Sequence, residues 1–306
     1  GVYLEQQHRA LRGPVIESQL AFWRKQLADL PLLDLPTDCV GRREESDRGA
    51  TLSIAFSAEL SQALLRIGRR QGATTFVTLM AALQTFLQRH TGQDDFGIGF
   101  PIANRPSREV EKLVGCFVNT LVLRADLSDD PPFTELLARV RSRALKAYAH
   151  QAAPYESLVQ EFRRPLFRVM LALQNAPAAN LNLPGIQIAP IETGTATAKF
   201  DLTFSVREFE GKLLGNVDYR TDLFEAVTIE RMLGRFQMLV QGIVADPEQR
   251  ISQLPLLAND EKRRLLVEWN DTDAAYSKNA CLHELFQEQV ERSPQSPAIC
   301  WVHQQL

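Results

Sequence analysis

The chain has 306 residues, of which 45% are hydrophobic and 23% charged, a composition typical of globular proteins that excludes a wholly disordered chain. With 34 basic and 37 acidic residues the net charge is −3, which argues against nucleic-acid binding through a basic field. No apolar run approaches the roughly 20 residues that a membrane span needs. We therefore expect neither nucleic acid nor membrane as a partner, and about two structural units at roughly 150 residues each.

The cysteines and histidines are scattered. No C-x-x-C pair occurs among the four cysteines (Cys39, Cys116, Cys281, Cys300), and the five histidines are isolated from one another (His8, His90, His150, His283, His303). This spacing argues against a zinc site or a disulfide framework and fits a reducing compartment. We expect no metal and no directly bound cofactor.

The first third of the chain alternates between helical and extended patterns. Apolar residues at spacings of three and four predict a helix that carries Trp23 and ends before Pro31. Alternation over residues 52–56 predicts a strand, and two helices follow, the second between Thr74 or Thr75 and Gly92. A further strand covers residues 96–102, and its Gly97 and Gly99 would let another backbone approach closely.

The remaining pattern is mixed. Residues 116–124 predict a buried strand, and a long helix begins near Pro132 with Asp129 and Asp130 as its cap. A short helix begins at Pro154. Further strands are expected at 166–174, 186–192, 200–207 and 212–220, before a last strong helix over 229–243. This order predicts an α/β or α+β layered fold, with a mixed sheet flanked by helices.

The character changes after Pro247. Residues 251–257 are expected to be extended, 259–269 to form a short helix and 270–279 to be polar, which is typical of an interdomain linker. An amphipathic helix begins after Cys281. A unit of about 25 residues cannot bury a core of its own.

Four ordered segments resemble successive core motifs of nonribosomal peptide synthetase condensation domains. They are Phe-Pro-Ile-Ala-Asn-Arg-Pro (100–106), Leu-Val-Gly-Cys-Phe-Val-Asn-Thr-Leu-Val-Leu-Arg (113–124), His-Gln-Ala-Ala-Pro-Tyr-Glu-Ser-Leu-Val (150–159) and Arg-Pro-Leu-Phe-Arg-Val-Met-Leu-Ala-Leu-Gln-Asn (164–175). Phe-Asp-Leu-Thr (200–203) supports them. The segment 282–294 is similar to the opening helix of an adenylation domain.

The resemblance implies a domain organisation. Residues 1–257 would be the C-terminal subdomain of a condensation domain, 258–280 an interdomain linker, and 281–306 the truncated start of an adenylation domain. The implied fold is one of two chloramphenicol-acetyltransferase-like halves with a tunnel between them. Donor and acceptor carrier proteins would insert phosphopantetheine thioesters there, and an amide would form. The implied location is the bacterial cytoplasm.

The sequence departs from the family pattern at one point. The signature of the family is His-His-x-x-x-Asp-Gly, and no His-His pair occurs in these 306 residues. We therefore expect a fragment that lacks the N-terminal subdomain and is inactive alone, with no catalytic residue of its own. Two alternatives remain open: an epimerisation or cyclisation relative, and a docking module for carrier or adenylation domains without chemistry.

The resemblance also assigns supporting residues. Arg105 matches the arginine that pairs with the Asp of the absent motif, so here it should be exposed or paired otherwise. Asn119, expected mid-strand, matches an asparagine near the tunnel, where it positions backbone or substrate, although a structural asparagine is equally consistent. Gln174 and Asn175 would line the channel or cap a loop. His150 and His90 are interpreted as structural helix-end residues.

Overall fold

The computed structural model describes residues 13–39, 46–105, 108–111, 113–174, 196–273, 281–297, 300–301 and 304–305. The chain divides into two compact units, residues 1–258 and residues 259–306. Each unit is described by itself below. Among the residues just given, no helix is long and apolar enough to cross a membrane.

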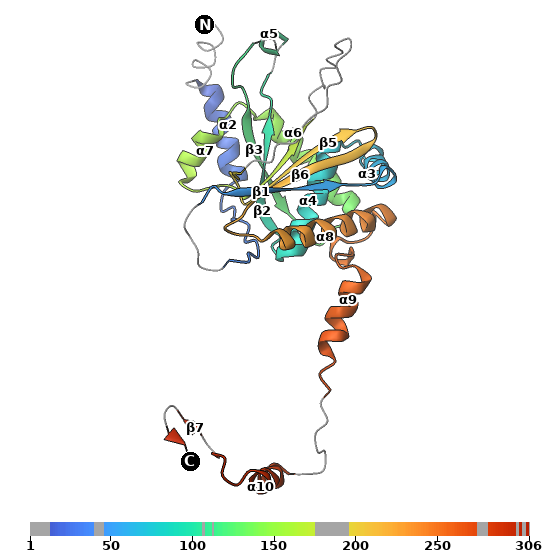
Figure 1. Ribbon diagram of the computed structural model, residues 1–306. Coiled ribbons are helices and arrows are strands. Elements are labelled where there is room, and N and C mark those ends of the chain that lie inside the picture. The colour runs from blue at the N-terminus through green and yellow to red at the C-terminus, as the bar shows by residue number, and fades with distance from the viewer. Residues whose placement is uncertain are drawn as a thin grey trace, which may run out of the picture. The chain divides into compact units, whose positions relative to one another are not determined.

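The first unit is built on a six-stranded mixed sheet (Figure 1). The strand order is β1-β6-β5-β4-β2-β3, with β1 at Gly49–Ala55, β6 at Lys212–Arg220, β5 at Leu202–Phe209, β4 at Val169–Leu173, β2 at Asp95–Ile102 and β3 at Asn119–Asp126. β4 runs parallel to both of its neighbours, and the other pairs are antiparallel. The mixed sheet predicted from the sequence is confirmed.

A layer of helices packs together against this sheet. It consists of α3 (Ala58–Arg70), α4 (Thr75–Thr91), α6 (Phe133–Ala149) and α8 (Ala226–Ala245). α4 lies deepest, because every side chain from Phe76 to Leu87 is buried. The Thr74 side chain caps its first turn, and Gly92 ends it in the left-handed conformation at φ 76°, as the sequence predicts.

Glycines of β2 admit close neighbours. A Cβ on Gly97 would lie 2.7 Å from the Leu166 carbonyl oxygen, so the predicted backbone approach is confirmed there. A Cβ on Gly99 would instead overlap the Phe167 ring at 2.3 Å. The shorter helices of this unit are α2 (Pro14–Gln26), α5 (Arg108–Glu111), α7 (Tyr155–Phe162) and the 3₁₀ turn η1 (Ile251–Gln253).

Several sequence predictions are corrected here. The strand expected at 116–124 begins only at Asn119, because residues 116–118 form no ladder. The residue that precedes α6 is Pro132, without a side-chain cap. Asp129 pairs instead with Arg139, and Asp130 accepts hydrogen bonds from Ser252. The segment expected to be extended at 251–257 opens with a 3₁₀ turn, and the strand expected at 186–192 lies outside the described residues.

The second unit contains short elements. They are α9 (Asn259–Leu266), η2 (Glu268–Asn270), α10 (Leu282–Arg292), β7 (Cys300–Trp301) and β8 (Gln304–Gln305). The helix expected at 259–269 is thus an α-helix followed by a separate 3₁₀ turn. Neither α9 nor α10 buries any residue.

Candidate functional site

One end of the sheet gathers the residues that the sequence singles out. β2 and β3 pair so that Ile102 faces Asn119, and Arg105 follows β2 by three residues. β4 runs parallel to β2, so that Gln174, directly after β4, belongs to the same end of the sheet. No hydrogen bond or ion pair found among the described residues joins these three side chains to one another.

Arg105 is half-buried and pairs with backbone. Its Nη1 donates to the carbonyl oxygens of Val110, Glu111 and Leu113, the last two at 3.3 and 2.9 Å. Its guanidinium also lies 4.3 Å from the centroid of the Phe117 ring, a cation–π contact. Arg105 therefore pairs with backbone carbonyl groups in place of a carboxylate. These bonds hold the loop that connects α5 to β3.

The loop held by Arg105 is unusually apolar for an exposed segment. Leu113, Val114 and Val118 are 43%, 104% and 63% exposed, and the Cys116 thiol is exposed and free. Asn104, directly before Arg105, has a positive φ of 49°, a backbone conformation that asparagine tolerates better than most residues. An apolar loop of this kind is a surface suited to contact with another protein surface.

Asn119 is the first residue of β3, whereas the sequence predicted it in the middle of a strand. Its Nδ2 donates to the carbonyl oxygens of Gln151 and Ala153 at 3.0 and 2.8 Å. Its Oδ1 accepts from the backbone N–H groups of Thr120 and Tyr155 at 2.9 and 3.1 Å. The amide has two donors and two lone pairs, so these four bonds use its whole capacity.

It follows that Asn119 ties the start of β3 to the segment that leads into α7. The bond to Tyr155 satisfies one of the N–H groups that every helix N-terminus leaves without an intrahelical partner. In this geometry the amide positions backbone and has no bond left for a substrate.

Among the described residues, the side chains of His150 and His90 make no hydrogen bond with Arg105, Asn119 or Gln174. His150 follows the last residue of α6, where its Nδ1 contacts the Lys146 carbonyl at 2.8 Å and its ring stacks on Phe22 at 3.7 Å. Burial, together with the charge of Arg235, lowers the pKa of His90 below its ordinary value. Both environments are those of packed helix-end residues.

The channel residues are placed only in part. Gln174 is exposed, and its backbone N–H donates to the Val206 carbonyl at 2.7 Å, which extends the pairing of β4 with β5. Asn175 lies outside the described residues. The predicted channel lining by these two residues stays a prediction.

The opposite end of the sheet carries an ionic cluster that the sequence did not predict. Asp201 is 8% exposed and lies 3.8 Å from Arg168 and 3.7 Å from Arg220, while Arg220 also pairs with Asp222 at 2.5 Å. Burial raises the pKa of Asp201, and the two arginines oppose that effect. The Phe-Asp-Leu-Thr segment was noted for its resemblance alone, since nothing local predicts the arginines from two other segments.

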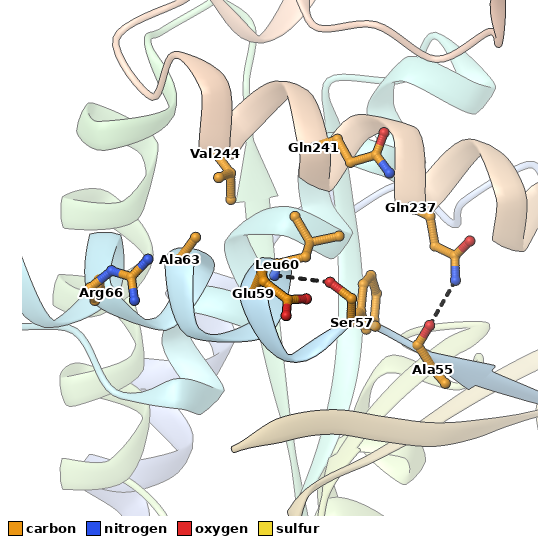
Figure 2. A pocket seen from close by; sticks show the side chains of 10 residues that line it. Ala55, Ser57, Glu59, Leu60, Ala63, Arg66, Gln237, Gln241 and Val244 are labelled. Atoms are coloured by element: carbon orange, nitrogen blue, oxygen red, sulfur yellow. Dashed lines mark hydrogen bonds between the residues drawn. The ribbon is translucent and has the colours of Figure 1, made fainter. Parts of the chain in front are cut away.

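A groove lies between α3 and α8 (Figure 2). It has a volume of about 580 Å³ and is open to solvent, and its polar lining includes Glu59 and Arg66 of α3 and Gln237 and Gln241 of α8. The Gln237 side chain donates to the Ala55 carbonyl at 2.9 Å across one end. Among the described residues, no cluster of three or more His, Cys, Asp or Glu could hold a metal ion.

Comparison with known proteins places the chain in a family. The model of the condensation domain family matches residues 2–266, and the chain belongs to that family. The match includes all of α9, which the sequence assigned to a linker, so the boundary predicted at 257 stays a prediction.

The curated relatives are far longer than this chain. A linear gramicidin synthase of Brevibacillus parabrevis is 44% identical over 96% of this chain, which covers 6% of that protein. Malpinin synthetase of Mortierella alpina is 39% identical over 99% of this chain and is covered to 4%. The chain thus spans a small part of the relatives it matches.

Solved structures agree on the fold. The X-domain from teicoplanin biosynthesis is 26% identical, with a TM-score of 0.76 over 83% of this chain and 61% of that one. A four-domain nonribosomal peptide synthetase bound to AMP and glycine is 22% identical, with a TM-score of 0.74 over 92% of this chain and 23% of that one. The chloramphenicol-acetyltransferase-like fold predicted from the resemblance is confirmed.

Proposed function

We propose that this chain is the C-terminal subdomain of a condensation domain in a nonribosomal peptide synthetase, followed by a linker and the start of an adenylation domain. The synthetase joins aminoacyl and peptidyl thioesters held on the phosphopantetheine arms of donor and acceptor carrier proteins. The observation that carries this proposal is the Asn119 clamp beside the loop held by Arg105, at one end of the sheet. The family match supports it.

The proposed chemistry divides between this chain and an N-terminal subdomain. An ammonium must first lose a proton, and the resulting amine nitrogen must then attack the thioester carbonyl. As the amide forms, the nitrogen loses a second proton, and the thiolate leaves and takes up a proton to become the thiol. Positioning of the two reactants can supply roughly 7–11 kcal/mol, and a general base roughly 10²–10⁴-fold. We assign positioning to this chain, and the histidine to an N-terminal subdomain that carries the His-His-x-x-x-Asp-Gly motif. The proposed location is the cytoplasm of a bacterium.

In the complete domain Arg105 would exchange its backbone partners for the aspartate of that motif. A planar guanidinium that now binds three carbonyl oxygens is preorganised for a carboxylate, which forms shorter and stronger bonds with it. The apolar loop at 113–118 would be covered at the same time, as its exposed side chains favour.

Reconstitution tests this proposal. The purified chain is mixed with donor and acceptor carrier proteins loaded with aminoacyl thioesters, and dipeptide is measured by mass spectrometry. We expect no product from the chain alone and product after addition of the N-terminal subdomain. A subdomain with its second motif histidine replaced by alanine is the matched control and should restore nothing. Robust turnover by the chain alone would refute the division of labour.

A second candidate function is recruitment of another protein without chemistry. One observation favours it: a solved structure that matches with a TM-score of 0.74 and 26% identity is a complex of the X-domain and OxyB from teicoplanin biosynthesis. In the assay above, recruitment without catalysis predicts carrier binding but no dipeptide, even with the N-terminal subdomain present.

A further inference from the structure

The α6–α7 turn, residues 149–153 from the end of α6 toward α7, is held by side chains of α2. Gln19 Nε2 donates to the Ala149 carbonyl at 3.4 Å, and Trp23 Nε1 donates to the His150 carbonyl at 2.9 Å. Gln19 and Trp23 are four positions apart and so lie on the same face of α2. Two consecutive carbonyl groups of the turn are therefore bound by one helix face.

α2 also contacts the segments on both sides of this turn. The Phe22 ring stacks on the His150 ring, with centroids 3.7 Å apart and planes 7° from parallel, and His150 in turn contacts the Lys146 carbonyl of α6. Arg24 forms an ion pair with Glu161 of α7, and α2 and α7 lie side by side in Figure 1. The position of the turn is thus determined by α2 together with the two helices that the turn joins.

The next carbonyl groups of the same turn are bound by Asn119 of β3. Its Nδ2 donates to those of Gln151 and Ala153 at 3.0 and 2.8 Å. The carbonyl that Trp23 binds and the first that Asn119 binds belong to adjacent peptide groups, and each peptide group is planar and stiff. A displacement of one carbonyl therefore displaces the other, so α2 and the start of β3 are linked through this turn.

Trp23 is the strongest contact that α2 makes with the turn. The side chain is 1% exposed, so its indole N–H is shielded from solvent, and the bond to the His150 carbonyl is shorter than the bond from Gln19. The indole nitrogen can only donate. Loss of this bond would leave the carbonyl oxygen without its partner, which favours a shift of the turn toward another donor.

We propose that Trp23 is a positioning residue for formation of the peptide bond, and that it acts through the α6–α7 turn on Asn119. The inference rests on the proposed function, which assigns positioning of the reactants to the end of the sheet where Asn119 and Arg105 stand. The indole keeps the carbonyl oxygens that orient the Asn119 amide in one place. Displacements of about 1 Å far from the reacting atoms can cost about a hundredfold in rate.

The kinetic test measures dipeptide formation by the full chain with the N-terminal subdomain and loaded carrier proteins. Trp23→Phe keeps an aromatic ring but has no N–H to donate. We expect kcat to fall at least about tenfold. KM for the acceptor carrier protein should stay within about twofold, because a side chain that is 1% exposed cannot touch the carrier protein.

Ile243→Val is the matched control. It removes one methyl group from a side chain of α8 that is 0% exposed, so it lowers stability without touching the turn. We expect kcat of this variant to stay within about twofold of the wild type. Thermal melts of all variants, with assays well below every transition, establish that each is folded.

Hydrogen–deuterium exchange of the full chain gives a readout besides activity. Asn119 Oδ1 accepts from the backbone N–H groups of Thr120 and Tyr155. In Trp23→Phe the exchange of the Tyr155 amide should accelerate at least about tenfold, while exchange in β5 and β6 stays unchanged.

The outcomes separate this inference from the proposed function. An active wild-type pair with unchanged kcat in Trp23→Phe overturns the inference and leaves the proposed function standing. An equal loss of kcat in Ile243→Val overturns the inference as well, since lost stability then explains the effect. A fall in kcat without faster exchange at Tyr155 overturns the route through the turn. A wild-type pair that forms no dipeptide overturns both the inference and the proposed function.

Discussion

Two regions of this chain use the same sequence pattern with opposite results. In residues 1–258 the apolar faces of helices meet a sheet, and Phe236 of α8 packs among Phe56, Phe86 and Phe204. In residues 259–306, α10 presents Leu282 at 87% and Phe286 at 56% exposure. A periodic pattern thus predicts a helix but not its burial, which requires a complementary surface within the same unit.

The largest expected effect is at a matched pair of phenylalanines. Phe236→Ala removes a side chain that is 4% exposed, and should destabilise the first unit by about 3–5 kcal/mol. Phe286→Ala removes one that is 56% exposed, and should change stability by less than about 0.5 kcal/mol. Urea unfolding followed by tryptophan fluorescence measures both. Similar losses in the two variants would show that α10 is buried as deeply as α8.

A smaller effect is expected at the Asn119 clamp. Asn119→Ala leaves two carbonyl oxygens and the Tyr155 N–H without their partner and should cost about 1–3 kcal/mol. Asn119→Asp keeps the acceptor but places a carboxylate against two carbonyl oxygens, so it should rescue nothing.

Asn216→Ala is the matched control for this clamp. Asn216 accepts a single bond from the exposed Ser53 at 3.1 Å, so its loss should cost less than about 0.5 kcal/mol. The same urea titration compares the three variants. If Asn119→Ala were as mild as Asn216→Ala, Asn119 would not be the link between β3 and α7.

The fold was predictable wherever local signals agree with packing. Thr74 and Gly92 mark both ends of α4, and the alternation over β5 and β6 matches their inward and outward residues. The errors come from long-range competition. Asp129 and Asp130 have the chemistry of caps, but Arg139 and Ser252 bind them instead. Residues 116–118 have strand propensity, but Arg105 holds the segment before them in a loop.

The site was predictable by resemblance more than by physics. Arg105 and Asn119 were found because their motifs match the family, and the bonds they make could not be inferred from local pattern. Asn119 binds residues 32 and 34 positions further along the chain. The cluster around Asp201 was not predicted from the sequence, because its arginines come from β6 and from the segment before β4.

The stability of the first unit should also depend on pH through His90. Burial and the charge of Arg235 lower the pKa of His90. His90 is therefore protonated at a lower pH in the folded state than in the unfolded chain, where a histidine takes up a proton near pH 6.5. Above that pH the group is neutral in both states and contributes nothing. As the pH falls below it, stability is lost, until the folded pKa is reached.

His90→Gln should therefore lose less stability than the wild type between pH 7.5 and 5.5, as urea midpoints at the two pH values will show. His283→Gln, on the exposed α10, should follow the wild type. If the pH dependence of His90→Gln matched that of the wild type, another group would be responsible.

The smallest effect is expected on removal of the second unit. Deletion of residues 259–306 takes away helices without a buried residue, so the free energy of unfolding of the first unit should change by less than about 0.5 kcal/mol.

A cut ten residues earlier removes Ile251 and Leu254, which are 0% and 1% exposed, and the carbonyl oxygens that Arg89 binds. That shorter chain should lose several kcal/mol, since each large apolar deletion costs about 2–5. The two cuts lie ten residues apart, on either side of the last buried residues of the first unit. A large loss at the first cut would mean that the boundary at 258 is wrong and that the second unit stabilises the first.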